Sequence, residues 1–291
     1  MHARKNTLPR AIAQYRRTVL ASAAVFSIAL TSACVSTPPQ SSTENTPTPA
    51  AAKASSEKES PKPTPTIDNS VAGQTILRLE KQGIEIGETV KVKGGSYPQY
   101  KVTKESKLAK FDKSKHSGGL PKGWTQKDAE KAQLAAANFL ANSAIDNPTL
   151  NDYEANQDQF ISLLKKSVAP EWMGVFSQGV LDQGKIYNDN TFELDSFIGD
   201  KTKGFRYPSD GKTPRIANLS DLSLKSSETW DGAIYYLYEG QYTTNVVDKN
   251  DEPYTMENLI TYGISIKKLD GKFLIYGVNY EDGKYSEPTP N

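Results

Sequence analysis

The stretch GISIKKLDGKFLIYGVNY, residues 263–280, decides the fold of this chain. Apolar and aromatic residues fill both of its halves, and Asp270-Gly271 separates them. Asp-Gly is typical of the two-residue type I′ turn, because both turn residues must adopt a positive φ. The sequence therefore predicts a β-hairpin with strands at 256–268 and 272–281.

This turn also predicts which residues share a face of the hairpin, because successive side chains of a strand point to opposite faces. Tyr262 is expected opposite Asn279. The predicted core face carries Ile260, Tyr262, Ile264, Ile266, Phe273, Ile275, Gly277 and Asn279. Asn279 is the polar side chain of that face, and a buried Asn requires hydrogen-bond partners. Tyr262 and Asn279, together with Tyr238 from the preceding strand, are therefore the candidate lining of a pocket.

The chain has 15 tyrosines, and many of them fall in predicted strands. The preference of tyrosine for strands accounts for such an enrichment by itself. The functional alternative is a ring of tyrosines at the mouth of a pocket, able to stack on a ligand or to hydrogen-bond it. The sequence leaves both interpretations open.

The segments before the hairpin combine helices and strands. Period-2 patterns predict strands at 216–228 and 232–247, and helical spacing predicts helices at 126–144, 151–168 and 171–182. Thr125, followed three residues later by Asp128, is a capping-box start for the first helix. Helices first and an antiparallel meander afterwards indicate an α+β fold, with N-terminal helices packed on a curved antiparallel sheet.

This order of elements, with the helix AQLAAANFLAN and the hairpin quoted above, resembles the nuclear-transport-factor-2-like fold. That cone-shaped fold is shared by SnoaL-type polyketide cyclases and ketosteroid isomerases. The resemblance covers roughly residues 119–285 and implies a sheet curved around a central space. Because the same fold serves enzymes, carriers and binding modules, the resemblance does not determine the function.

The N-terminus has the pattern of a secretory signal peptide. Arg16-Arg17 precede the charge-free run Val19–Leu30, which is shorter than the roughly 20 apolar residues that a membrane-spanning helix needs. An uncut membrane anchor remains the alternative interpretation.

Cys34, the one cysteine of the chain, follows this run in the stretch Leu30-Thr31-Ser32-Ala33-Cys34. The stretch resembles the lipobox of bacterial lipoproteins, although Thr31 stands where that motif usually has Leu, Val or Ile. The resemblance implies cleavage between Ala33 and Cys34 and attachment of a diacylglyceryl group, with fatty acids such as palmitate, to Cys34. Two acyl chains suffice for stable membrane anchoring. The alternative is an unmodified cysteine in a discarded signal peptide.

Ser, Thr, Pro and Ala dominate the chain after Cys34, and such a segment cannot bury enough apolar surface to fold. The predicted organisation is a signal peptide at 1–33, a disordered tether at 34–71, short strands or irregular chain at 72–115, the α+β domain at 116–285 and a disordered tail at 286–291. The lysine-rich part of 101–119 is expected to be a second linker.

Charge and motifs exclude several classes of function. Without residues 1–33 the chain carries slightly more acids than bases, which disfavours nucleic-acid binding. A lone cysteine excludes multi-cysteine metal sites, and no metal or cofactor is expected. His116 is expected in a solvated loop, Ser162 and Lys165 form an isolated SxxK pattern, and the acidic group at 248–252 lacks the glycine of a calcium loop.

These observations favour a lipid-anchored, non-catalytic binding or scaffolding protein on the outer face of the cell membrane. Its expected partners are a cell-wall component, another protein or a small apolar ligand. The alternative is a SnoaL-like enzyme or carrier for a small hydrophobic ligand.

Overall fold

The computed structural model describes residues 68–92, 95–147, 157–177, 180–182, 185–188, 192–194 and 204–291. They belong to one compact unit, Ile67–Asn291. The predicted signal peptide, Ala33, Cys34 and most of the tether lie outside the described residues. Within the described part of the chain, no helix is both long and apolar enough to cross a membrane.

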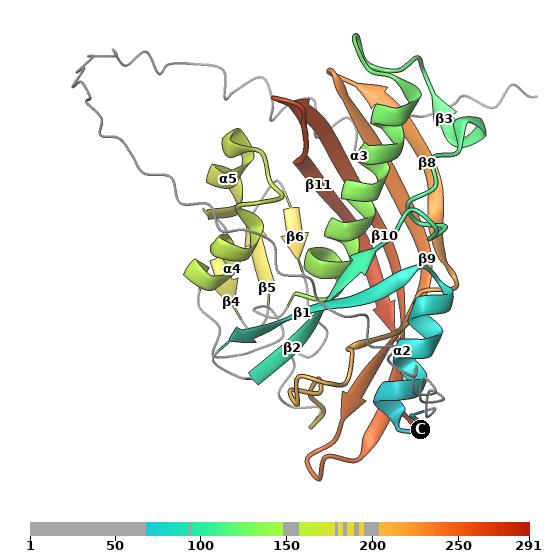
Figure 1. Cartoon of the computed structure of the whole chain (residues 1–291). Helices are drawn as coiled ribbons and strands as arrows, with labels where there is room; N and C mark the ends of the chain where they lie inside the picture. Colours follow the sequence, from blue (N-terminus) through green and yellow to red (C-terminus); the bar gives the residue numbers. More distant parts are fainter. Residues whose placement is uncertain are drawn as a thin grey trace, which may run out of the picture. The chain divides into compact units, whose positions relative to one another are not determined.

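A seven-stranded sheet forms the centre of this unit (Figure 1). The strands run in the order β11-β10-β9-β8-β3, with β7 paired to β9 and β12 paired to β10. Their bounds are β3 His116–Ser117, β7 Ile216–Asn218, β8 Leu222–Trp230, β9 Ala233–Val247, β10 Pro253–Leu269, β11 Lys272–Tyr285 and β12 Thr289–Pro290. The sheet is mixed, because β3 pairs with β8 in parallel while the other pairs are antiparallel. Helices and sheet together confirm the α+β class.

Two Asp-Gly turns join the long strands. Asp270 and Gly271 both have positive φ, 48° and 76°, as the type I′ turn predicted between β10 and β11 requires. Asp231 and Gly232 have nearly the same geometry between β8 and β9, with φ of 47° and 74°. The local sequence therefore determined both hairpins.

The predicted register of the β10–β11 hairpin is correct only next to its turn. Ile266 lies opposite Ile275 as expected, but Ser265 already lies opposite Gly277, so that Tyr276 is an extra residue in β11. Such a β-bulge moves all later side chains of a strand to the other face. The predicted pairing of Tyr262 with Asn279 is therefore wrong.

Beyond the bulge, Tyr262 lies opposite Tyr280 and Asn279 lies opposite Gly263. The bulge adjoins the point where another segment pairs with the edge of β11. Ala169 donates its N–H to the Ile275 carbonyl, and the Ile275 N–H is donated to the Ser167 carbonyl, both at 2.8 Å. The tertiary contact and the bulge therefore occur together.

Strand β9 changes partners at Gly240. Up to this residue β9 pairs with β8, and from Thr243 it pairs with β7. Gly240 has a φ of +139°, and a Cβ atom there would lie 2.1 Å from the Asp221 carbonyl oxygen. Only glycine lets the two backbones come this close at the bend.

The inner face of the sheet, which carries Ile234, Tyr236, Tyr238, Tyr262, Ile264 and Ile266, is packed against helix α3 Gln126–Phe139 (Figure 1). The capping box predicted from Thr125 and Asp128 is present at the start of this helix. Asp128 also forms an ion pair with Lys268 at 3.0 Å. The helical winding continues as the π-helix η2 Leu140–Ile145, which completes the predicted span 126–144.

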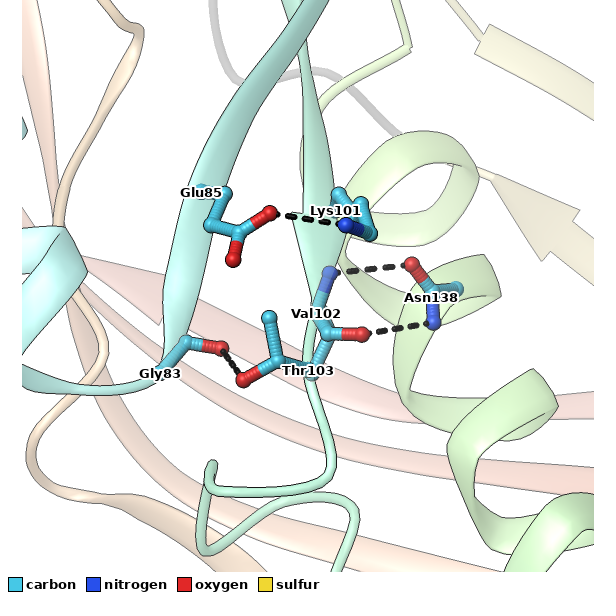
Figure 2. A network of polar contacts seen from close by, with 6 residues as sticks. All are labelled: Gly83, Glu85, Lys101, Val102, Thr103 and Asn138. Atoms are coloured by element: carbon cyan, nitrogen blue, oxygen red, sulfur yellow. Dashed lines mark hydrogen bonds and ion pairs between the residues drawn. The ribbon is translucent and has the colours of Figure 1, made fainter.

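A β-hairpin of β1 Ile84–Val92 and β2 Gly95–Val102 is fastened to α3 and η2 by two asparagines. The Asn138 side chain pairs with both the N–H and the carbonyl of Val102 (Figure 2). Asn142, one helical turn later, pairs in the same way with Tyr100. These side-chain amides replace the neighbouring strand that β2 lacks on this edge.

The segment before this hairpin forms helix α2 Val71–Lys81, which the sequence analysis does not expect. Ser70 caps the helix by accepting the Gly73 N–H. The expected second linker is wrong as well, because Leu108 is buried and Ser106 lies in the core beside it. The 3₁₀ helix η1 Lys113–Lys115 follows before β3.

The remaining elements are short. They are α4 Gln157–Leu164, α5 Pro170–Ser177, β4 Val180–Asp182, β5 Lys185–Asn188 and β6 Phe192–Leu194. The predicted helix 171–182 is wrong at its end, because Val180–Asp182 pairs with β5 as a strand. The start of the predicted helix 151–168 lies outside the described residues. The predicted strand 216–228 is divided into β7 and β8, and the tail expected to be disordered contains β12.

Candidate functional site

The three predicted pocket residues have different environments. Tyr238 is fully buried, and its hydroxyl donates to the Leu108 carbonyl at 3.2 Å, so that it fastens the chain before α3 to the sheet. Tyr262 is also buried on the inner face, where its ring lies 6.0 Å from that of Tyr280. Asn279 is half-buried on the opposite face, because of the bulge, and cannot form the pocket floor.

Tyr262 differs from its neighbours in its hydroxyl. No hydrogen-bond partner for this oxygen is found among the described residues, although the side chain is 1 % exposed. Burial raises the pKa of Tyr262 well above its usual range, so the hydroxyl stays protonated. It is a neutral group whose hydrogen-bonding capacity is not used by the described protein.

Arg215, which the sequence analysis does not single out, is the largest fully buried side chain of the described residues. Its Nη1 lies 2.9 Å from Oδ1 of Asp146, which is buried as well. The guanidinium carbon lies 3.7 Å from the centre of the Tyr97 ring and 5.5 Å from that of Tyr207. A buried charge pair with aromatic rings beside the cation is therefore built into the core.

The Arg215–Asp146 contact is close but is not aligned as a hydrogen bond. Nε, Nη1 and Nη2 of Arg215 all lack a properly oriented hydrogen-bond partner among the described residues. The distance in the ion pair gives Coulomb attraction, while the direction of the N–H bonds leaves their hydrogens without an acceptor in the described part of the chain. We therefore regard this pair as electrostatically matched and incompletely hydrogen-bonded.

Three separate parts of the chain supply this cluster. Asp146 directly follows η2, Tyr97 lies on β2, and Arg215 directly precedes β7. Tyr100, also on β2, accepts the Ile216 N–H at 2.9 Å. Burial, followed by the negative charge of Asp146, raises the pKa of Tyr100 well above its usual range.

The π-helical winding of η2 sets the position of Asp146. Each π turn contains an extra residue, and such turns are frequent at functional sites. The Asp146 N–H still donates to the Ala141 carbonyl, at 3.1 Å, so the carboxylate follows the last turn directly. Asp146 therefore follows the last π turn directly and lies beside Arg215.

The other motifs have structural explanations. His116 is half-buried and not in a solvated loop: Nδ1 lies 3.0 Å from the Ser227 hydroxyl and Nε2 lies 3.3 Å from the Thr229 hydroxyl. Burial lowers its pKa. Ser162 and Lys165 of the SxxK pattern are both exposed.

The acidic group at 248–252 forms a closed turn. Asp248 Oδ1 accepts the N–H groups of Asn250 and Glu252, and Asp251 forms an ion pair with Arg206. Among the described residues, no group of three His, Cys, Asp or Glu side chains is arranged to hold a metal ion.

Comparison with known proteins finds no matching family model, no similar curated protein and no similar solved structure. The function therefore has to be argued from the residues of this chain. No local sequence pattern distinguishes Arg215, because the sequence around Pro214-Arg215-Ile216-Ala217 would equally suit an exposed arginine beside a strand.

Proposed function

We propose that this protein is a lipid-anchored binding protein on the outer face of the cell membrane, and that it catalyses no reaction. The position of Cys34 carries this proposal. The residue lies between an apolar run too short to span a membrane and a Ser/Thr/Pro-rich tether, and the compact unit begins only at Ile67. An acylated cysteine at this place would hold the folded unit at the membrane through the Ser/Thr/Pro-rich segment.

The proposed absence of catalysis is supported by the chemistry of the buried polar groups. Asp146, the buried acid beside Arg215, is ion-paired, and both ring nitrogens of His116 face hydroxyl groups. Groups held in this way serve poorly as general acids or bases, which need a free position facing a substrate. A cone of the nuclear-transport-factor-2-like type, with α3 on its inner face, is the fold we infer for this unit.

Metabolic labelling with an alkyne analogue of palmitate tests the anchor. In a bacterial host that processes lipoproteins, the full chain should take up the label and sediment with membranes. Cys34→Ser should lose the label and leave the membrane fraction, and Thr31→Leu, which restores the usual lipobox residue, should process at least as well. Labelling that survives in Cys34→Ser would contradict the proposal.

A carrier or SnoaL-like enzyme for a small hydrophobic ligand is the second candidate, and the Tyr262 hydroxyl favours it. This group is buried beside Tyr280 and has no hydrogen-bond partner among the described residues. Native mass spectrometry of the full chain after exposure to detergent-solubilised envelope separates the two candidates. A reproducible added mass that Tyr262→Phe loses would favour the carrier, and turnover of that compound would favour the enzyme.

A further inference from the structure

Residues 104–131 give one part of the compact unit an excess of positive charge. This stretch contains eight lysines and four acidic residues, whereas the rest of residues 67–291 contains 19 basic and 27 acidic residues. All eight lysines are exposed, and together we call them the lysine surface: Lys104, Lys107, Lys110, Lys113, Lys115, Lys122, Lys127 and Lys131. The charge of the unit is therefore divided into a basic part and an acidic remainder.

The backbone that carries the first of these lysines is fixed against helix α3. Gln133 of α3 donates to the carbonyls of Leu108 and Lys110 at 2.9 and 2.8 Å. Ser106, Leu108 and Ala109, which alternate with the lysines, are buried. The lysines consequently project from a stretch of chain that is packed into the fold, and their charges are held close together.

The other side of this stretch is attached to strand β8. The Lys107 ammonium group donates to the Ser220 carbonyl, and the Lys115 ammonium group donates to the Leu224 carbonyl at 2.8 Å. The chain then pairs with the end of β8 as β3 and turns back into α3 (Figure 1). The lysine surface therefore lies along α3 and the neighbouring edge of the sheet.

The acids of the stretch neutralise this charge only in part. Asp128 forms its ion pair with Lys268, which lies outside the stretch, and Asp112 accepts hydrogen bonds from its own loop. Within the described residues, Lys104 forms the one ion pair of the lysine surface, with Glu105 at 3.9 Å, and both residues are exposed. An exposed pair of this kind contributes little, so the lysine surface keeps its positive potential.

The type of cation indicates the type of partner. The stretch contains lysines and no arginine. Arginine binds single phosphates or carboxylates with two parallel hydrogen bonds, whereas the lysine ammonium is a hydrated point charge on a long stem. A group of such charges suits a surface with spread negative charge. The acidic remainder of the unit would be repelled by the same surface, so the charge division also orients the unit.

The reach of the chain leaves the choice of the docking face to charge. Thirty-two residues lie between Cys34 and Ile67, and a chain of this length spans at most about 110 Å. Strand β10, with 17 residues, is about 60 Å long at the usual rise per residue. An anchor at Cys34 therefore lets any face of the unit reach the membrane.

We propose that the lysine surface docks on anionic phospholipid headgroups of the membrane that carries the anchor. The docking rests on the proposed lipid anchor, because a unit that is already held near the membrane needs only a weak attraction to lie on it. Each lysine close to an anionic membrane strengthens binding about fivefold. Such docking would keep the acidic remainder of the unit turned away from the lipid.

The test is a lysine footprint of the full chain on vesicles. The chain is bound to vesicles of phosphatidylcholine alone or of phosphatidylcholine and phosphatidylglycerol in equal parts, and its lysines are acetylated and measured one by one by mass spectrometry. We expect the lysine surface to react about threefold or more slowly on the anionic vesicles. Lys91, Lys249 and Lys284, which are exposed elsewhere, should react equally on both. Salt at about 1 M, where the screening length is about 3 Å, should remove the protection.

Two triple variants make the footprint specific. Lys104→Glu with Lys110→Glu and Lys113→Glu should remove the protection of the five remaining lysines of the surface. Lys91→Glu with Lys249→Glu and Lys284→Glu is the matched control, because it changes the net charge equally and should keep the protection.

Equal acetylation on the two kinds of vesicle would overturn the proposal, and so would a loss of protection in both triple variants. Protection by soluble polyphosphate without protection on anionic vesicles would also overturn it and would identify an anionic polymer as the partner. The palmitate label reports on Cys34 and the footprint reports on single lysines, so a failed anchor and a failed docking surface give separate results.

Discussion

Three buried tyrosines on one face of the sheet show how two regions of this protein differ. Tyr236 and Tyr238 donate their hydroxyls to backbone carbonyls, Tyr236 to Ala129 in α3 and Tyr238 to Leu108. Tyr262, directly opposite Tyr238 on β10, has no such partner among the described residues. The face under α3 is thus closed by hydrogen bonds within the chain at Tyr236 and Tyr238, but not at Tyr262.

The region around Arg215 is buried equally well, but fewer of its side-chain donors have hydrogen-bond acceptors among the described residues. Gln133, on α3, donates its amide group to the carbonyls of Leu108 and Lys110 at 2.9 and 2.8 Å, although its Oε1 has no partner among the described residues. None of the three Arg215 nitrogens has an aligned acceptor among the described residues. Buried polar groups are nearly always hydrogen-bonded, and exceptions mark strain, bound water or function. The comparison therefore separates buried polar groups whose donors are used within the fold from those whose donors have no aligned acceptor among the described residues.

The largest expected effect is the loss of folding stability when the Arg215–Asp146 pair is broken. Arg215→Met should lower the free energy of unfolding by about 3–5 kcal/mol, because it leaves the buried Asp146 charge uncompensated. Urea unfolding of the full chain, followed by near-UV circular dichroism, measures the change. Arg206→Met, at the exposed pair with Asp251, is the control and should cost about 1 kcal/mol or less.

The double variant Arg215→Met with Asp146→Leu sharpens this result. Replacing both charges by apolar side chains should recover much of the loss, because the unpaired charge rather than the missing attraction causes it. If Arg215→Met costs no more than Arg206→Met, the cluster is not the buried ion pair described above.

The next effect separates the three tyrosines. Tyr236→Phe and Tyr238→Phe should each lower the free energy of unfolding by about 1 kcal/mol, because a buried backbone carbonyl loses a donor. Tyr262→Phe should be neutral or slightly stabilising, since it removes a hydroxyl that has no partner among the described residues. Chemical unfolding of the three variants under one condition makes the comparison, and equal losses in all three would erase the distinction between Tyr262 and the two hydrogen-bonded tyrosines.

The smallest effect concerns the start of α3. Hydrogen bonds from the Thr125 backbone, together with Lys268 and the Thr125 hydroxyl, lower the pKa of Asp128 to about 2 from its usual 3.8. A carboxylate with a lowered pKa stabilises the fold above its unfolded pKa and loses this contribution as the pH falls through its folded value. Between pH 4 and pH 2, roughly, Asp128→Asn should therefore lose less stability than the unchanged chain does. The measurement is the free energy of unfolding of both proteins at several pH values in this range. If it falls by the same amount in both, Asp128 contributes nothing to the pH dependence.

The sequence by itself determined the elements whose cause is local. Asp270-Gly271 gives the β10–β11 turn because both residues tolerate positive φ, and Thr125 with Asp128 gives the start of α3 because their side chains bond to nearby backbone. The burial of Tyr262 also followed from strand periodicity.

Only the tertiary structure decided the register and the candidate site. The bulge at Tyr276 adjoins the pairing of residues 167–169 with β11, and it places Asn279 on the face opposite to the predicted one. Asp146, Tyr97 and Arg215 meet because η2, β2 and the chain before β7 converge, although they are far apart in the sequence. Turns and caps depend on a few neighbouring residues, whereas a buried ion pair depends on contacts that no local pattern contains.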